Sequence, residues 1–167
     1  MDPRIRPATE EDVEEIVDLV IELAVYEREP DAVKLTPETL RGQLFGDSPA
    51  LFAFVADAPE GSGRRINGFA LWFLNYSTWE GTHGIYLEDL YVREAARGSG
   101  LGKALLLALA ETAVARGFKR VEWSVLRWNE PSIAFYRSLG AFPMDGWDTM
   151  RLTGDALTAA GRAGASA

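Results

Sequence analysis

The sequence contains no cysteine and only one histidine, His83, among its 167 residues. The lack of cysteine excludes a disulfide framework, a thiolate nucleophile and a cysteine zinc site. One histidine cannot build a two-histidine metal centre, so we expect no metal cofactor. No apolar run approaches the roughly 18 residues that a membrane-spanning helix needs, and the first residues do not begin a secretory signal. We therefore expect a cytoplasmic protein with no membrane partner.

Positive charge is scarce at the start of the chain. Residues 1–31 hold 11 acidic and 3 basic residues, which accounts for the whole net charge of −8. Because the remaining residues are balanced and form no basic stripe, we expect no nucleic-acid partner. An acidic protein of this kind favours cationic partners instead.

Hydrophobic periodicity predicts alternating helices and strands in the order β-α-α-β-β-β-α-β-α-β. The helices are expected over about 17 residues after a Thr9–Asp12 capping box, from Thr36 to Gly46, over 101–117 and over 129–139. The strands after the first are expected over 51–57, 66–76, 84–92, 120–126 and 147–152. The fold class is therefore α/β, in the α+β sense, with a mixed sheet, because hairpins precede a parallel crossover. We expect one domain over residues 1–155 and a frayed tail over 156–167.

The segment after the strand at 84–92 is rich in glycine and leads directly into a helix. Its residues are Arg97, Gly98, Ser99, Gly100, Leu101, Gly102 and Lys103. Glycines allow a ligand to approach the backbone, and the free N–H groups of a first helical turn favour phosphate. The nucleotide P-loop pattern fails at Arg97 and Ala104, and the dinucleotide pattern fails at Lys103. The sequence thus indicates a phosphate site that is neither of these.

The pattern Arg-x-x-Gly-x-Gly at 97–102 resembles the pyrophosphate-binding motif of the GCN5-related N-acetyltransferases (GNAT). Downstream, Asn129-Glu130-Pro131-Ser132 with Phe135-Tyr136 resembles the second cofactor motif of this family. The resemblance implies the GNAT fold, a mostly antiparallel sheet flanked by about four helices. It also implies acetyl-CoA as the acetyl donor.

Further segments resemble the spermidine/spermine and thialysine N-acetyltransferase branch of the family. They are Tyr26-Glu27, Val33 to Thr36, Tyr76 to Trp79, Tyr86 to Asp89, Trp128 to Pro131 and Gly146-Trp147. The branch acetylates small amines and implies a homodimer and a small cationic amine as partner. Its polyamine-specific members carry an acid where this chain has Ser77, whereas Tyr76-Ser77-Thr78-Trp79 is closer to the thialysine type.

The resemblance also implies roles for individual residues. Glu88 would remove the amine proton through a water, since a bound ammonium with a pKa near 10.4 has no lone pair. Tyr136 would protonate the leaving thiolate, and Glu27, Trp79, Asp89 and Trp147 would bind the amine. The donor would be held by Leu90, Tyr91, Val92, Asn129, Ser132, Tyr136 and the segment 97–103.

Each role has a structural alternative. Glu88 and Asp89 are adjacent on a strand, so they point to opposite faces unless a bulge intervenes. Tyr136 can be a core aromatic beside Phe135, and Asn129 can simply cap a helix. Two other functions also stay open, namely acetylation of a protein N-terminus or lysine, and a non-catalytic CoA-binding module.

Overall fold

The computed structural model describes residues 1–164 of the chain. By its internal contacts the chain divides into two compact units, Met1–Ser124 and Val125–Ala167, and each is described by itself. The first unit contains the whole sheet. Its elements are β1 (Ile5–Pro7), η1 (Glu10–Asp12), α1 (Val13–Tyr26), α2 (Pro37–Phe45), β2 (Phe52–Asp57), β3 (Ile66–Ser77), β4 (Thr82–Val92), η2 (Glu94–Ala96), α3 (Leu101–Ala115) and β5 (Val121–Trp123). The second contains α4 (Glu130–Ser138) and α5 (Gly154–Gly164).

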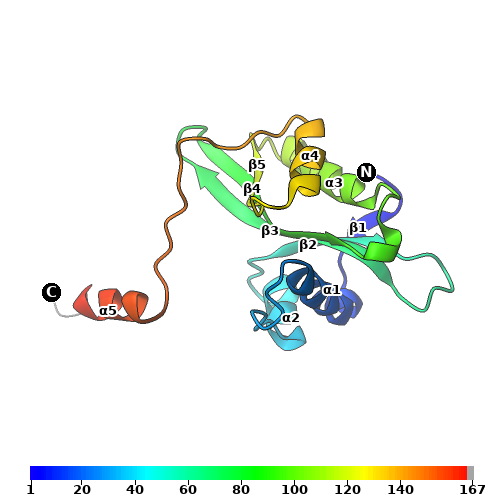
Figure 1. Cartoon of the computed structure of the whole chain (residues 1–167), viewed down its shortest axis with the longest axis horizontal. Coiled ribbons are helices and arrows are strands. Elements are labelled where there is room, and N and C mark those ends of the chain that lie inside the picture. The colour runs from blue at the N-terminus through cyan, green and yellow to red at the C-terminus, as the bar shows by residue number, and fades with distance from the viewer. Residues whose placement is uncertain (165–167) are drawn as a thin grey trace. The chain divides into compact units, whose positions relative to one another are not determined.

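The five strands form one sheet in the order β1-β2-β3-β4-β5 (Figure 1). Neighbouring strands are antiparallel except for β4 and β5, which pair in parallel over Ile85–Leu87. The crossover between these two strands contains α3. The predicted mixed, mostly antiparallel sheet is therefore confirmed.

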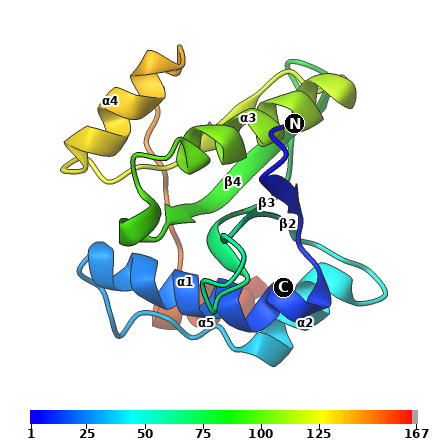
Figure 2. The ribbon, with the colours of Figure 1, turned by 90° about the vertical axis from the view of Figure 1, so that its right-hand side faces the viewer.

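Helices cover both faces of this sheet. Figures 1 and 2 show α1 and α2 on one face and α3 on the other. The core between α1, α2 and the sheet includes Ile16 and Leu19 of α1, Leu40 of α2, and Phe69 and Leu71 of β3. These α1 residues follow the helical spacing of the sequence, so burial of one apolar face holds the helix on the sheet.

The helix starts expected from the sequence are present. The Asp12 carboxylate accepts a hydrogen bond from the Thr9 backbone N–H at 2.8 Å, as the capping box requires. The Thr36 hydroxyl accepts from the Thr39 N–H at 3.2 Å, and Pro37 follows in the first turn of α2. The Thr9–Asp12 box caps η1, which leads directly into α1, and the Thr36 cap begins α2.

Two expectations for the C-terminal part were wrong. Residues 147–152 do not form the predicted strand: they pair with no strand of the described sheet, and pairing is what holds a strand. Residues 154–164 form α5 where the frayed tail over 156–167 was predicted, and every side chain described in α5 is exposed. Its four alanines indicate that local helix propensity, rather than packing, forms this helix. Residues 165–167 of that predicted tail lie outside the described residues. The strand predicted over 120–126 is shorter, at Val121–Trp123.

Candidate active site

A β-bulge interrupts β4 at Glu88. Leu87 pairs with Trp72 and Asp89 pairs with Leu71, so Glu88 is an extra residue on β4. Cross-strand partners share a face of the sheet, and Leu71 belongs to the core beneath α1. The bulge therefore turns Asp89 toward the α1 face, where strict alternation from Leu87 would not have placed it. From the sequence, Glu88 and Asp89 were expected on opposite faces unless a bulge intervened. The structure has a bulge at this point.

Three carboxylates gather around this bulge. Burial raises the pKa of Asp89 to about 6, and the nearby carboxylates of Glu88 and Glu27 add to the effect. Burial also raises the pKa of Glu27. Glu88 is exposed, whereas Asp89 is half-buried. A half-buried cluster of like charges is a site that a cation would stabilise.

The end of α1 fixes the position of Glu27. Glu27 is the C-cap residue of α1, and its N–H donates to Leu23 O at 2.8 Å. Arg28 follows with φ of 68°, the left-handed turn that commonly ends a helix but that a non-glycine residue seldom adopts. The Glu29 N–H closes this turn on Ala24 O at 2.9 Å. The acidic side chain thus lies on a rigid helix end.

The edge of β4 is open beyond the bulge. The Ile85 N–H donates to Arg120 O, next to β5, whereas the Arg93 N–H donates to Asn67 O beside β3. Because N–H directions alternate along a strand, the N–H groups of Leu90 and Val92 point away from β3. Pairing with β5 ends at Leu87, so these two donors face the open side and can bind a carbonyl oxygen.

The glycine-rich segment forms the start of α3. Gly98 and Gly100 have φ of 79° and 83°, values that favour glycine, and Gly100 is the N-cap of α3. No side chain caps this end of the helix. The N–H groups of the first turn, from Leu101 to Lys103, have no partner within the helix and make an anion site. The predicted phosphate loop therefore has the expected backbone form.

The side chain of Arg97 has a different task from the one its motif suggests. Its Nε donates to Val92 O at 3.1 Å. Its guanidinium carbon lies 5.0 Å from the centre of the Tyr26 ring and 5.3 Å from that of Tyr91. These cation–π contacts hold the loop against the ends of α1 and β4. The Arg97 side chain is thus engaged within the protein, whereas the N–H groups of the first turn of α3 have no partner within the helix.

Four predicted residues belong to the second unit. The Asn129 side chain accepts from the Ser132 N–H at 3.4 Å, so Asn129 caps α4. Helix capping was the structural role expected for Asn129 as an alternative to donor binding. Tyr136 is half-buried on α4, and its ring centre is 5.2 Å from that of Phe135. Trp147 is 68% exposed.

Trp79 and Ser77 lie at the tip of the β3–β4 hairpin. Thr82, at this tip, is seven residues from Asp89 along β4, or about 23 Å at ~3.3 Å per residue. Trp79 is therefore not brought together with the carboxylates of its own chain, and it is 85% exposed. Ser77 is buried, and its hydroxyl accepts from the Glu80 N–H at 3.2 Å. Ser77 thus supports the hairpin turn.

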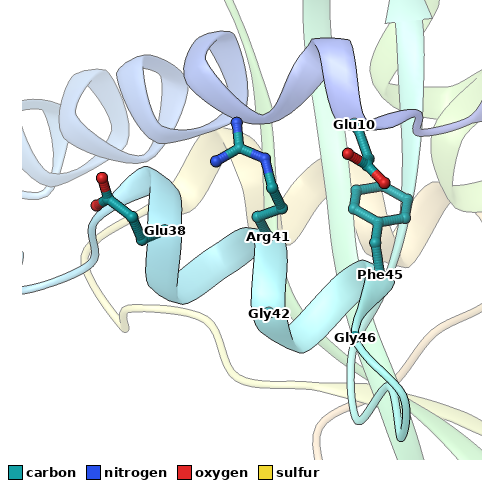
Figure 3. A pocket seen from close by; sticks show the side chains of 6 residues that line it. All are labelled: Glu10, Glu38, Arg41, Gly42, Phe45 and Gly46. Carbon is teal, nitrogen blue, oxygen red and sulfur yellow. The ribbon is translucent and has the colours of Figure 1, made fainter.

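A surface hollow of about 340 Å³ lies elsewhere, beside α2 (Figure 3). It is lined by Glu10, Glu38, Arg41, Gly42, Phe45 and Gly46, none of which is a predicted site residue. Arg41 is paired with Glu14 at 2.7 Å. This hollow shares no residue with the carboxylate cluster, so we do not place the active site there.

Residues 1–164 contain neither a candidate metal cluster nor a candidate membrane-spanning helix. No group of three or more acidic or histidine side chains there could hold a metal ion. No helix in the same range is both long enough and apolar enough to cross a membrane.

Two contacts of the loop were not predicted from the sequence. One is the stacking of Arg97 on the Tyr26 ring, although Tyr26-Glu27 is one of the segments that resemble the thialysine branch. The other is Arg4, whose Nη1 donates to Ser99 O at 3.0 Å across 95 residues of chain. No local pattern signals a contact of that span, which the sheet creates by placing β1 in reach of α3.

This chain resembles known proteins in sequence and in fold. Residues 14–141 match the model of the acetyltransferase (GNAT) family. Thialysine N-epsilon-acetyltransferase of Bos taurus is 39% identical over 160 residues, covering 92% of this chain and 94% of that protein. L-ornithine N5-acetyltransferase of Arabidopsis thaliana is 34% identical, covering 93% and 86%. An integron cassette protein from V. cholerae shares the fold, with a TM-score of 0.77 at 23% identity, covering 95% of this chain and 96% of that one.

The family match includes the bulged strand, the glycine-rich loop and α4, and the two enzyme relatives align with nearly the whole chain. The chain therefore belongs to the acetyltransferase (GNAT) family.

Proposed function

We propose that this protein transfers an acetyl group from acetyl-CoA directly to a primary amine of a small cationic molecule. The observation that carries the proposal is the junction at the bulge of β4. There, one strand bears carboxylates for a cation, open N–H groups for a carbonyl oxygen, and a following loop for phosphate. No metal is needed for this chemistry.

The donor side consists mainly of backbone groups. The N–H groups of the segment 97–103 would hold the pyrophosphate, and those of Leu90 and Val92 would polarise the acetyl carbonyl. Tyr91 lies between these two donors along the strand and packs on Arg97. Asn129 and Ser132 would contact the pantetheine arm or support its loop. The residues present therefore suit acetyl-CoA as the co-substrate.

The acceptor side consists of Glu27, Glu88 and Asp89. The amine must lose a proton before its nitrogen attacks the acetyl carbon, and we assign that proton to Glu88 through a water. Asp89 and Glu27 would hold the cation, since the charge of each carboxylate is stabilised by a bound ammonium. The nitrogen–carbon bond forms as the carbon–sulfur bond breaks. Tyr136 then gives its proton to the departing thiolate, whose thiol has a pKa near 8.5.

We base the acceptor class on the relatives rather than on Ser77, which replaces the acid of polyamine-specific enzymes. Both enzyme relatives are named for amino acids with a side-chain amine. An amino acid of this kind is compact and brings one terminal ammonium to the cluster. Since Ser77 caps a turn, the missing acid at that position does not by itself argue against a polyamine. We therefore propose thialysine, ornithine or a similar short amine as acceptor.

We further propose a cytoplasmic homodimer with one acetyltransferase domain over residues 1–155. The family match crosses the boundary between the two units, which supports a single domain. Exposed apolar side chains between the last two helices support a contact with a second copy, among them Phe142 at 78% and Met150 at 90%. A cytoplasmic location suits an enzyme that consumes acetyl-CoA.

An acceptor screen tests the proposed reaction. Values of kcat/KM with acetyl-CoA are measured for thialysine, ornithine, putrescine, spermidine and a lysine peptide at one ionic strength. We expect thialysine or ornithine to lead. Spermidine ahead by tenfold or more would overturn the acceptor class, and a preference for the peptide would favour protein acetylation.

The acidic cluster predicts that kcat/KM depends on pH. Below pH about 6, Asp89 gains a proton and loses the charge that attracts an ammonium. The value of kcat/KM, which reports the free enzyme, should therefore fall as the pH is lowered through about 6. Asp89→Asn should lower kcat/KM and flatten this limb, while the exposed control Asp47→Asn should keep it. An unchanged acid limb in Asp89→Asn would assign the titration to another group.

A further inference from the structure

The N-terminal turn brings a second cation to the glycine-rich loop. Asp2, Pro3, Arg4 and Ile5 form a β-turn in which the Ile5 N–H donates to Asp2 O at 2.9 Å. Proline at the second position presets the backbone for such a turn. The amino group of Met1 pairs with Glu111 of α3 at 2.8 Å. The turn is thus fastened beside α3.

The guanidinium of Arg4 is held in a fixed orientation. Its Nε and Nη2 donate to the two carboxylate oxygens of Asp2 at 3.0 and 2.8 Å. Its Nη1 donates to Ser99 O at 3.0 Å, and its Nη2 lies 4.0 Å from where a Cβ on Gly100 would stand. A guanidinium has five N–H groups, so two meet no acceptor among residues 1–164.

The charge requirement of acetyl-CoA exceeds what one helical turn offers. The molecule carries a pyrophosphate and a further phosphate on its ribose, and a helix end supplies only about half a positive charge. Arg97 is engaged with Val92 O and two tyrosine rings. Arg4 is a side-chain cation tied to the loop itself that keeps free donors, and its side chain is 46% exposed.

We propose that Arg4 donates to a phosphate of acetyl-CoA, with Asp2 orienting its guanidinium for that contact. This inference rests on the proposed function, because it identifies a further binding residue for the same donor. The pyrophosphate and the ribose 3′-phosphate offer the same chemistry. Phosphate and planar guanidinium suit one another through charge and paired hydrogen bonds.

Calorimetry on the full chain tests the contact without relying on turnover. Acetyl-CoA and acetyl-3′-dephospho-CoA are titrated into wild type, Arg4→Gln and the control Lys119→Gln. Lys119 is exposed beyond the far end of α3, roughly 22 Å from the loop for a helix of this length. We expect Arg4→Gln to weaken acetyl-CoA binding about tenfold and Lys119→Gln to change it less than twofold. A loss confined to acetyl-CoA assigns the ribose phosphate, and an equal loss for both ligands assigns the pyrophosphate.

The dependence of acetyl-CoA affinity on ionic strength distinguishes a phosphate contact of Arg4 from a purely structural hydrogen bond to Ser99 O. Screening weakens an exposed charge contact, so the penalty of Arg4→Gln should shrink between low and high ionic strength. A penalty that does not change with salt, or wild-type affinity in Arg4→Gln, overturns the inference alone. Failure of the wild-type protein to bind acetyl-CoA overturns the proposed function and this inference together.

Discussion

Replacement of Gly100 by valine is expected to reduce acetyl-CoA affinity by at least about 100-fold. A β-branched residue strongly disfavours the φ of 83° at this position, and its side chain would project over the N–H groups of the first turn of α3. Each lost hydrogen bond to a charged phosphate is worth about 1.5–3 kcal/mol, so two suffice for a loss of this size. Calorimetric titration with acetyl-CoA measures the effect.

Gly61→Val is the matched control. Gly61 also has a positive φ, 78°, and no atom would lie within 4 Å of an added Cβ, but it sits in the loop between β2 and β3. Both variants therefore carry the same kind of backbone strain, and only the strain at Gly100 is at the loop. Unchanged acetyl-CoA affinity in a folded Gly100→Val protein would remove the loop from the donor site.

Tyr136→Phe is expected to lower kcat by roughly 100-fold or more while acetyl-CoA binding changes little. The substitution keeps the ring that contacts Phe135 and removes only the hydroxyl. Loss of the proton donor slows departure of the thiolate, so single-turnover measurements should show the defect in the chemical step.

Tyr76→Phe serves as the control, because Tyr76 is a 55% exposed tyrosine at the end of β3. Its kcat should match that of wild type. If the single-turnover rate of Tyr136→Phe were also near normal, Tyr136 would be a packing residue of α4 and the general acid would lie elsewhere.

The sequence was sufficient for most of the fold because the informative signals were local. Thr9, Thr36 and Asn129 cap helices in the structure as their short-range patterns predict. Apolar spacing located the helices and the hairpins in the same way. The failures involve partners: the strand at 147–152 needed a neighbour that no periodic pattern specifies, and α5 forms although every side chain described in it is exposed.

The candidate site was predictable in its residue types but not in its geometry. The glycines of the loop carry a backbone requirement that the sequence displays directly. The bulge at Glu88 does not, since it follows from the register between β3 and β4. Without knowledge of this bulge, the sequence predicts neither the orientation of Asp89 nor the burial that raises its pKa. The side-chain positions of Arg97 and Arg4 likewise depend on contacts between distant segments.

The most direct test of the central claim is to follow the label from radiolabelled acetyl-CoA in the presence of thialysine. We expect the label to appear on the amine in proportion to enzyme and time, and none to stay covalently bound to the protein. Label that accumulates on the protein would contradict direct transfer. Consumption of acetyl-CoA without any labelled thialysine, ornithine or diamine would contradict the assignment as a small-molecule N-acetyltransferase.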